Sequence, residues 1–185
     1  MTTPTTTTTD LTGTYTLDAT HSRLGFSARH AMVTKVRGHF ADFEGTATLD
    51  SNDVSKSFAD VTIAVASIFT GQAQRDEHLR TNDFFDAPTF PTITFKSTGV
   101  EVVDADNYRV TGDLTIKDVT KPVTVDFEHT GTAKDPYGNL RAGFEGKAVI
   151  NRKDYGIAFN AALETGGVLV SEKIVLEFDI SAIKQ

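Results

Sequence analysis

The chain has 185 residues, a formal net charge of −7 and no Cys. A chain of this length favours one domain with a sizeable core, and the lack of Cys excludes disulfides, thiolate catalysis and Cys-based metal sites. No apolar run approaches the roughly 18 residues of a transmembrane helix, and Lys and Arg do not cluster along the sequence. We therefore expect no stable membrane insertion, no nucleic acid partner and no attraction to anionic membrane surfaces.

The first ten residues, MTTPTTTTTD, are of low complexity. Such a segment cannot bury apolar area, so residues 1–10 are predicted to form a disordered tail. They lack both the charged and the apolar region of a signal peptide, which predicts a cytoplasmic location. Residues 11–185 are predicted to form a single domain.

Apolar and polar residues alternate along most of the chain, which is typical of half-buried strands. In chain order, the predicted strands cover residues 15–17, 24–32, 61–67, 92–97, 108–117, 123–129, 144–150 and 173–183. Turn-forming segments such as 104–107 and 135–139 separate neighbouring strands. Short connections of this kind favour antiparallel hairpins.

Residues 70–91 break the alternation. Helix-forming residues over 72–81 predict one short helix there. The segment that follows contains Phe84, Phe85 and Phe90. These rings are expected to pack back against the strands, where they either wall a channel or cap one end of the fold.

The strand pattern leaves a sandwich or a barrel as the architecture. Long strands favour the barrel, and Gly112, Gly143 and Gly146 suit the bends of a closing sheet. We predict an all-β fold: an eight-stranded antiparallel up-and-down barrel with one short helix in the 70–91 connection. A barrel of this size is either solid or holds one small ligand.

Six segments resemble, in order and spacing, the YceI-like family. They are YTLDATHSRLGFSARH (15–30), VRGHFADFEGTATLD (36–50), LRTNDFFDAPTFPTITFKST (79–98), GDLTIKDVTKPV (112–123), GFEGKAVINRKDYGI (143–157) and SEKIVLEFDI (171–180). The resemblance runs from about Leu11 to the C-terminus. It implies a lipocalin-like barrel whose apolar channel holds an isoprenoid chain, such as a polyprenyl phosphate or a quinone tail. It also implies no catalytic activity, and a homodimer in several members.

One position departs from the family pattern. The family often has Gly where this chain has Asp118. The replacement is expected to change the hairpin turn and to leave the channel unchanged.

Alternation places His30 on the apolar face of its strand, with Leu24 and Phe26. A lone His on such a face is either a hydrogen-bonded core residue or a polar group on a channel wall. In the second interpretation, its imidazole hydrogen-bonds a lipid head group or a quinone carbonyl.

Arg152 shares the parity of the inward-facing Ile150. One interpretation places Asn151, Arg152 and Asp154 at a channel mouth, where the guanidinium would bind a phosphate or carboxylate. The alternative is an ion pair of Arg152 with Asp154 or Asp86 that fixes a turn.

The leading hypothesis is a non-enzymatic protein that carries or sequesters an isoprenoid lipid or quinone. The predicted ligand-binding residues are Phe26, His30, Phe40, Phe43, Phe85, Phe90, Phe95, Ile116, Phe127, Phe144, Asn151, Arg152 and Phe159. Alternation supports most of the wall positions, whereas Phe40, Phe43 and Phe159 depend more on the family resemblance.

Two other function classes stay open: an enzyme acting on a lipid or quinone with His30 as acid or base, and a solid barrel that serves as an interaction module. The sequence contains no nucleophile elbow and no zinc protease motif. His21, His30 and His39 recur at intervals of nine residues, an odd spacing that reverses the facing along a strand. Neither a metal nor another cofactor is expected.

Overall fold

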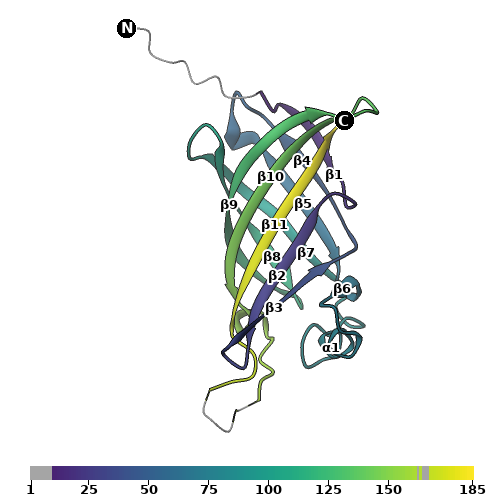
Figure 1. Ribbon diagram of the computed structural model, residues 1–185. Helices are drawn as coiled ribbons and strands as arrows, with labels where there is room; N and C mark the ends of the chain where they lie inside the picture. The colour runs from purple at the N-terminus through teal and green to yellow at the C-terminus, as the bar shows by residue number, and fades with distance from the viewer. Residues whose placement is uncertain (1–9, 162, 164–166) are drawn as a thin grey trace.

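Antiparallel pairing of neighbouring strands carries the chain around a closed ring (Figure 1). The computed structural model describes residues 10–161, 163 and 167–185. Of the tail predicted for residues 1–10, all but Asp10 lies outside the described residues.

The described residues form eleven strand segments and one α-helix. The strands are β1 (Gly13–Leu17), β2 (Arg23–His30), β3 (Thr34–Phe40), β4 (Phe43–Leu49), β5 (Phe58–Ala64), β6 (Ile68–Phe69), β7 (Thr92–Val102), β8 (Asn107–Ile116), β9 (Val119–Lys134), β10 (Leu140–Asn151) and β11 (Lys173–Lys184). The helical segments are α1 (Ala73–Leu79) and the 3₁₀ turns η1 (Val54–Lys56), η2 (Val65–Ser67) and η3 (Arg152–Tyr155). No helix in this part of the chain is long and apolar enough to cross a membrane.

The eleven segments make eight long strands, because three of the eight are interrupted. Strands β1 and β2 both pair with β11, at its two halves. β4 pairs with β1 and β3 pairs with β2, so β3 and β4 together form the second long strand of the barrel. β5 pairs with β4 and β6 pairs with β3, and these two form the third. Pairing of β1 with β11 then closes the ring. The predicted eight-stranded antiparallel up-and-down barrel is confirmed, with its short helix inside 70–91.

The composition of the eight strands differs from the prediction in one place. Residues 34–49 form a full strand, β3 and β4, that the alternation did not predict. Inward positions in β3 carry even numbers (Gly38, Phe40), whereas those in β4 carry odd numbers (Phe43, Ala47), because the bend at Ala41–Asp42 shifts the parity. The predicted strands 15–17 and 24–32 are, in turn, two parts of one long strand.

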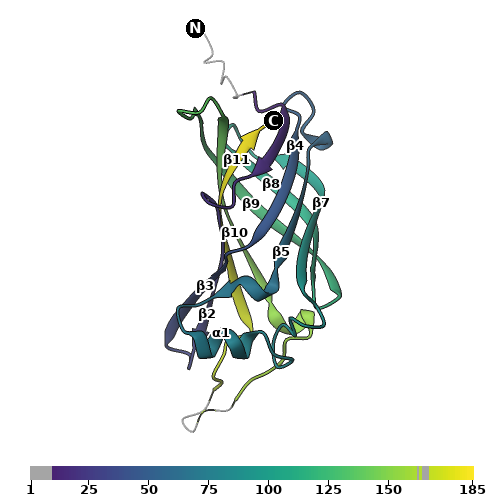
Figure 2. The same cartoon turned by 90° about the vertical axis from the view of Figure 1, so that its right-hand side faces the viewer.

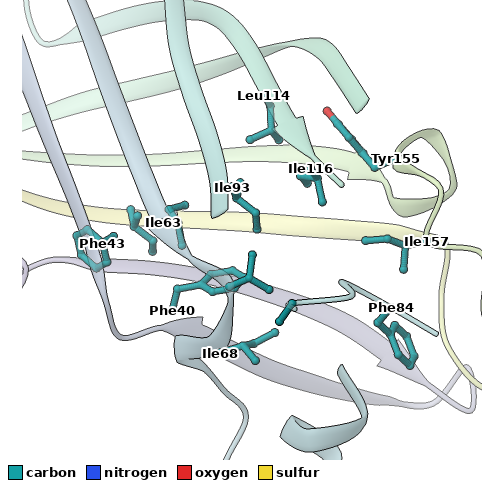
Figure 3. Packing of buried hydrophobic residues seen from close by; sticks show 13 residues of the cluster. Phe40, Phe43, Ile63, Ile68, Phe84, Ile93, Leu114, Ile116, Tyr155 and Ile157 are labelled. Atoms are coloured by element: carbon teal, nitrogen blue, oxygen red, sulfur yellow. The ribbon is translucent and has the colours of Figure 1, made fainter. Parts of the chain in front are cut away.

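The interior contains two groups of buried side chains, one toward each end of the barrel. Leu11, Tyr15, Ala142 and Ala182 pack together where β1 begins and β11 ends; this is the Tyr15 end. The larger group lies toward α1 and the β2–β3 hairpin, which both views place at the opposite end (Figures 1 and 2); this is the helix end. Figure 3 shows this group, which draws on most of the strands.

The β8–β9 turn shows what the departure at Asp118 does. Lys117 and Asp118 have φ values of +52° and +65°, a left-handed conformation that Gly adopts freely and that Asp tolerates better than most residues. Neither residue lines the interior cavity described below.

Arg141 ties two connections together near the Tyr15 end. Its guanidinium donates to Asp18 Oδ2 at 2.6 Å and to Asp135 Oδ2 at 2.9 Å. Hydrogen bonds from Thr20 and Arg141 hold the pKa of Asp18 far below its usual range. The pKa of Asp135 falls to about 2, because hydrogen bonds from Asn139 and Arg141 outweigh the opposing effect of burial.

The Arg141 contacts should make the stability of the barrel depend on acid pH. Both carboxyl pKa values are lower in the folded chain than the ordinary 3.8, so their stabilisation is complete above that pH and declines as the pH falls toward 2. The variant Arg141→Gln should therefore have a lower urea midpoint than wild type at pH 7, and the difference should shrink at pH 2. An equal difference at the two pH values would contradict this account.

Candidate functional site

A cavity of about 330 Å³ runs along the inside of the barrel. Leu11 and Tyr15 line it at one end, and Tyr155 and Ile157 line it at the other. The wall between them is built from inward-facing side chains of the ring strands and is almost wholly apolar. The barrel is therefore not solid, and its interior offers an apolar ligand a place removed from water.

Eight of the thirteen predicted ligand-binding residues line this cavity. They are Phe26, Phe40, Phe85, Phe95, Ile116, Phe127, Phe144 and Arg152. Phe43 belongs to the buried group at the helix end, and the half-buried Phe159 packs against that group, but neither lines the cavity. Phe90 is half-buried away from the cavity. Asn151 is exposed, and its Oδ1 accepts a hydrogen bond from the Lys153 N–H at the start of η3.

His30 lies outside the cavity wall. Along β2 the inward residues Leu24, Phe26 and Ala28 line the cavity, but His30 is exposed. It is the last residue of the strand, where the hairpin projects beyond the ring, and its backbone bridges to Val170. The alternation of apolar and polar residues along β2 thus continues beyond the last residue that lines the cavity. The His30 imidazole therefore does not lie inside the channel.

The 70–91 connection closes the helix end of the cavity. Leu79, Phe84 and Phe85 line the cavity there, and Phe85 meets the Phe40 ring edge-on at 6.0 Å. On its other side, Phe84 packs against His78 and Phe159, with ring centroids 5.1 and 5.2 Å away. Phe84 and Phe85 therefore act as wall and cap at the same time.

Two large rings of the wall lie directly over glycines of the neighbouring strand. A Cβ on Gly146 would lie 2.6 Å from Cδ1 of Phe127, and a Cβ on Gly112 would lie 2.7 Å from Cε2 of Phe95. The missing side chains leave room for the rings to lie close against the sheet. Any larger residue would push the ring toward the bore.

Arg152 is 4% exposed, and its stem lines the helix end of the cavity. Its Nε donates to Ser171 O at 2.8 Å, Nη1 to Ile157 O at 2.8 Å and Nη2 to Val170 O at 3.2 Å. Within the described residues it forms neither of the two ion pairs considered above, with Asp154 or with Asp86. Burial lowers the pKa of Arg152, although Glu172 opposes the effect. The guanidinium therefore fastens the connection between β10 and β11 to the barrel.

Tyr155 is the second polar side chain at this end of the wall. It is 2% exposed, and burial, with a contribution from Asp154, raises its pKa to about 12. No group in the described part of the chain hydrogen-bonds its hydroxyl, in contrast to Tyr15, which donates to Leu11 O at 2.9 Å. Figure 3 shows Tyr155 beside Ile116 and Leu114, both of which line the cavity.

The described residues contain no group of three or more His, Asp or Glu side chains that could hold a metal ion.

The YceI-like domain family matches residues 15–182. The chain belongs to this family. UPF0312 protein SA2479 of Staphylococcus aureus is 42% identical over 164 residues, which cover 88% of this chain and 93% of that protein. The resemblance predicted from the six sequence segments is thereby confirmed.

The fold of this YceI-like chain is similar to the folds of several solved structures. The Campylobacter jejuni YCEI protein superposes with a TM-score of 0.73 at 32% identity, covering 85% of this chain and 90% of that one. Burkholderia cenocepacia BcnA gives a TM-score of 0.78 at 25% identity, covering 89% and 98%. A polyisoprenoid binding domain from Saccharophagus degradans shares the fold at 15% identity, with a TM-score of 0.64 and coverage of 92% and 98%.

Several wall residues of this YceI-like barrel were missing from the predicted set. Leu176, Phe178 and Ile180 line the cavity from β11, and the alternation of that strand already placed them on one face. Tyr155 ends the 3₁₀ turn η3, and Ile157 follows it, so no period of two exists there to indicate them.

The glycine beneath Phe127 should be required for the packing of the YceI-like wall. Gly146→Ala should lower the free energy of unfolding by about 1–3 kcal/mol, because the added methyl group overpacks the ring and Val125. The matched control is Gly99→Ala, where nothing lies within 4 Å of the new Cβ, and its effect should stay within about 0.5 kcal/mol. Urea denaturation measures both, and equal effects would contradict the close approach.

The stability of the barrel should depend on the planar guanidinium of Arg152 and not on its positive charge alone. Arg152→Lys keeps the charge but leaves carbonyl groups unpaired, so the free energy of unfolding should fall by about 2–3 kcal/mol. The adjacent Lys153 forms an exposed ion pair with Glu172 at 2.7 Å, and Lys153→Gln should cost less than about 1 kcal/mol. Equal losses in the two variants would argue against the carbonyl-binding role.

Proposed function

We propose that this YceI-like protein binds one long isoprenoid lipid, such as a polyprenyl phosphate or a quinone, with the apolar tail in the barrel cavity, and so carries or sequesters it. The observation that carries the proposal is the continuous apolar wall from Leu11 and Tyr15 to Tyr155 and Ile157. A bore longer than it is wide suits a chain-like ligand better than a compact one.

The driving force for such binding is the removal of the tail from water. Each buried CH₂ group contributes about 0.8 kcal/mol. The two charged residues that line the cavity both have hydrogen-bond partners: Asp50 Oδ1 accepts from the N–H groups of residues 52 and 53, and the Arg152 nitrogens donate to backbone carbonyls. The Saccharophagus degradans domain of the same fold is described as binding polyisoprenoid, which makes this ligand class the first to test.

The helix end of the cavity offers a polar contact for a head group. Tyr155 lines this end of a mostly apolar wall, together with Arg152. A tyrosine hydroxyl is protonated at neutral pH, and burial raises the pKa of Tyr155 further. A protonated hydroxyl would donate a hydrogen bond to a quinone carbonyl or to a phosphate oxygen. We place the head group at this end, with the tail toward Tyr15.

The geometry favours binding over the two other function classes. An enzyme that used His30 as acid or base would need the imidazole beside the ligand, but His30 is exposed beyond the wall. A solid barrel that serves as an interaction module would not contain a cavity of about 330 Å³.

Filling the bore should block binding. Val123→Phe places a ring on the cavity wall, and we expect the affinity for a polyprenyl phosphate or a long-chain quinone to fall at least tenfold, as about 1.4 kcal/mol of tail burial is lost. Native mass spectrometry with added lipid should show a one-to-one adduct for wild type and little for the variant.

The matched control is Thr124→Phe, which places the same ring on the exposed side of β9 next to Val123. It should bind lipid as wild type does. The proposal fails if wild type binds neither lipid, or if both Phe variants lose binding equally.

A further inference from the structure

The β2–β3 hairpin presents two apolar side chains to solvent at the helix end of the barrel. Met32 is 64% exposed and Val33 is 77% exposed. Both lie in the turn that joins β2 to β3, and the hairpin projects at the same end of the barrel as α1 (Figures 1 and 2). Exposed apolar residues at a projecting turn contribute nothing to the core.

Strand pairing gathers basic side chains behind this turn. Arg29 lies directly opposite Lys35, and Arg37 lies two residues further along the same face. All three are exposed. The surrounding segment 19–41 contains four Lys and Arg residues and no Asp or Glu. Because the turn separates these cations in the sequence, the cluster exists only in the folded hairpin.

Two features of the hairpin work against its own stability. Like charges directly opposite each other on paired strands repel, as Arg29 and Lys35 do. Ala31 and Met32 adopt φ values of +50° and +63°, which strain residues with a side chain and which Gly or Asn would adopt more easily. A turn selected for stability alone would carry other residues at these positions.

We propose that this hairpin tip, residues 29–37, docks on an anionic lipid membrane surface. Met32 and Val33 insert among the head groups, and Arg29, Lys35 and Arg37 contact the lipid phosphates. Apolar residues flanked by cations are the combination that binds peripherally to anionic bilayers. The chain as a whole carries a net charge of −7, so attraction to such a surface depends on this local cluster of cations and not on the overall charge of the protein.

The size of the tip distinguishes a membrane from a protein partner. A stable protein interface buries on the order of 1,000 Å² or more, which two exposed apolar residues on a narrow hairpin do not supply. Insertion into a head-group layer needs no matching surface. Ala28, the residue directly before the tip, still lines the cavity, so docking would bring the helix end of the cavity to the bilayer.

Vesicle co-sedimentation tests the proposal without any isoprenoid, so its outcome is separate from that of the proposed lipid binding. The protein should bind vesicles of phosphatidylglycerol with phosphatidylcholine, and it should not bind vesicles of phosphatidylcholine alone. Added salt should weaken the binding, because exposed charges are screened.

The charge variant is Arg29→Gln/Lys35→Gln. Near an anionic surface each cation contributes roughly fivefold in affinity, so this double variant should bind about 25-fold more weakly. Its matched control is Lys56→Gln/Lys134→Gln, which removes the same charge from exposed positions at the Tyr15 end. The control should bind as wild type does.

The variant Met32→Asn separates docking from folding. Asn adopts the left-handed conformation more readily than Met, so the thermal midpoint should rise while vesicle binding falls. The proposal is overturned if wild type ignores anionic vesicles, or if the Tyr15-end control loses as much binding as the tip variant. It is equally overturned if tip variants change the oligomeric state in size-exclusion chromatography and leave vesicle binding unaltered.

Discussion

Closure of the sheet through β1 and β11 is the constraint on which the interior of this protein depends. Three residue pairs, from Tyr15–Lys184 to Leu17–Ala182, join the first strand to the last. β1 is only five residues long and pairs with β4 on its other edge. Tyr15 anchors it by burying its ring and donating its hydroxyl to Leu11 O. Because the ring has no free edge here, every inward side chain faces the same enclosed space.

An enclosed space of this kind stays hollow only if its side chains do not meet across the middle. Phe95 and Phe127 lie against glycines of the neighbouring strand and keep their bulk near the wall. At the helix end the opposite arrangement holds, since Phe84 and Phe85 stack with Phe40 and Phe159 across the opening. The same residue type therefore lines the bore or closes it, depending on what lies beneath the ring.

Much of the fold was predictable because one rule governs most of it. Alternation along β7, β8 and β9 predicted Phe95, Ile116 and Phe127 on the wall, where the structure has them. The rule fails where a strand bends or ends: the parity change at Ala41–Asp42 hid β3 and β4, and His30 lies beyond the last wall residue of β2. The ion pair considered for Arg152 is not formed within the described residues, because its guanidinium binds carbonyls of an irregular connection whose path no local pattern predicts.

The shape of the cavity restricts how a chain-like ligand could change its orientation inside it. A ring of paired strands surrounds the bore near the Tyr15 end, and the wall there is drawn from β1, β11 and their neighbours. An occupant lying lengthwise in such a tube has no room to turn end over end. Its orientation can be reversed only by leaving and re-entering. The two orientations of a guest in this barrel therefore equilibrate through the mouth, by release and rebinding, and not inside the bore.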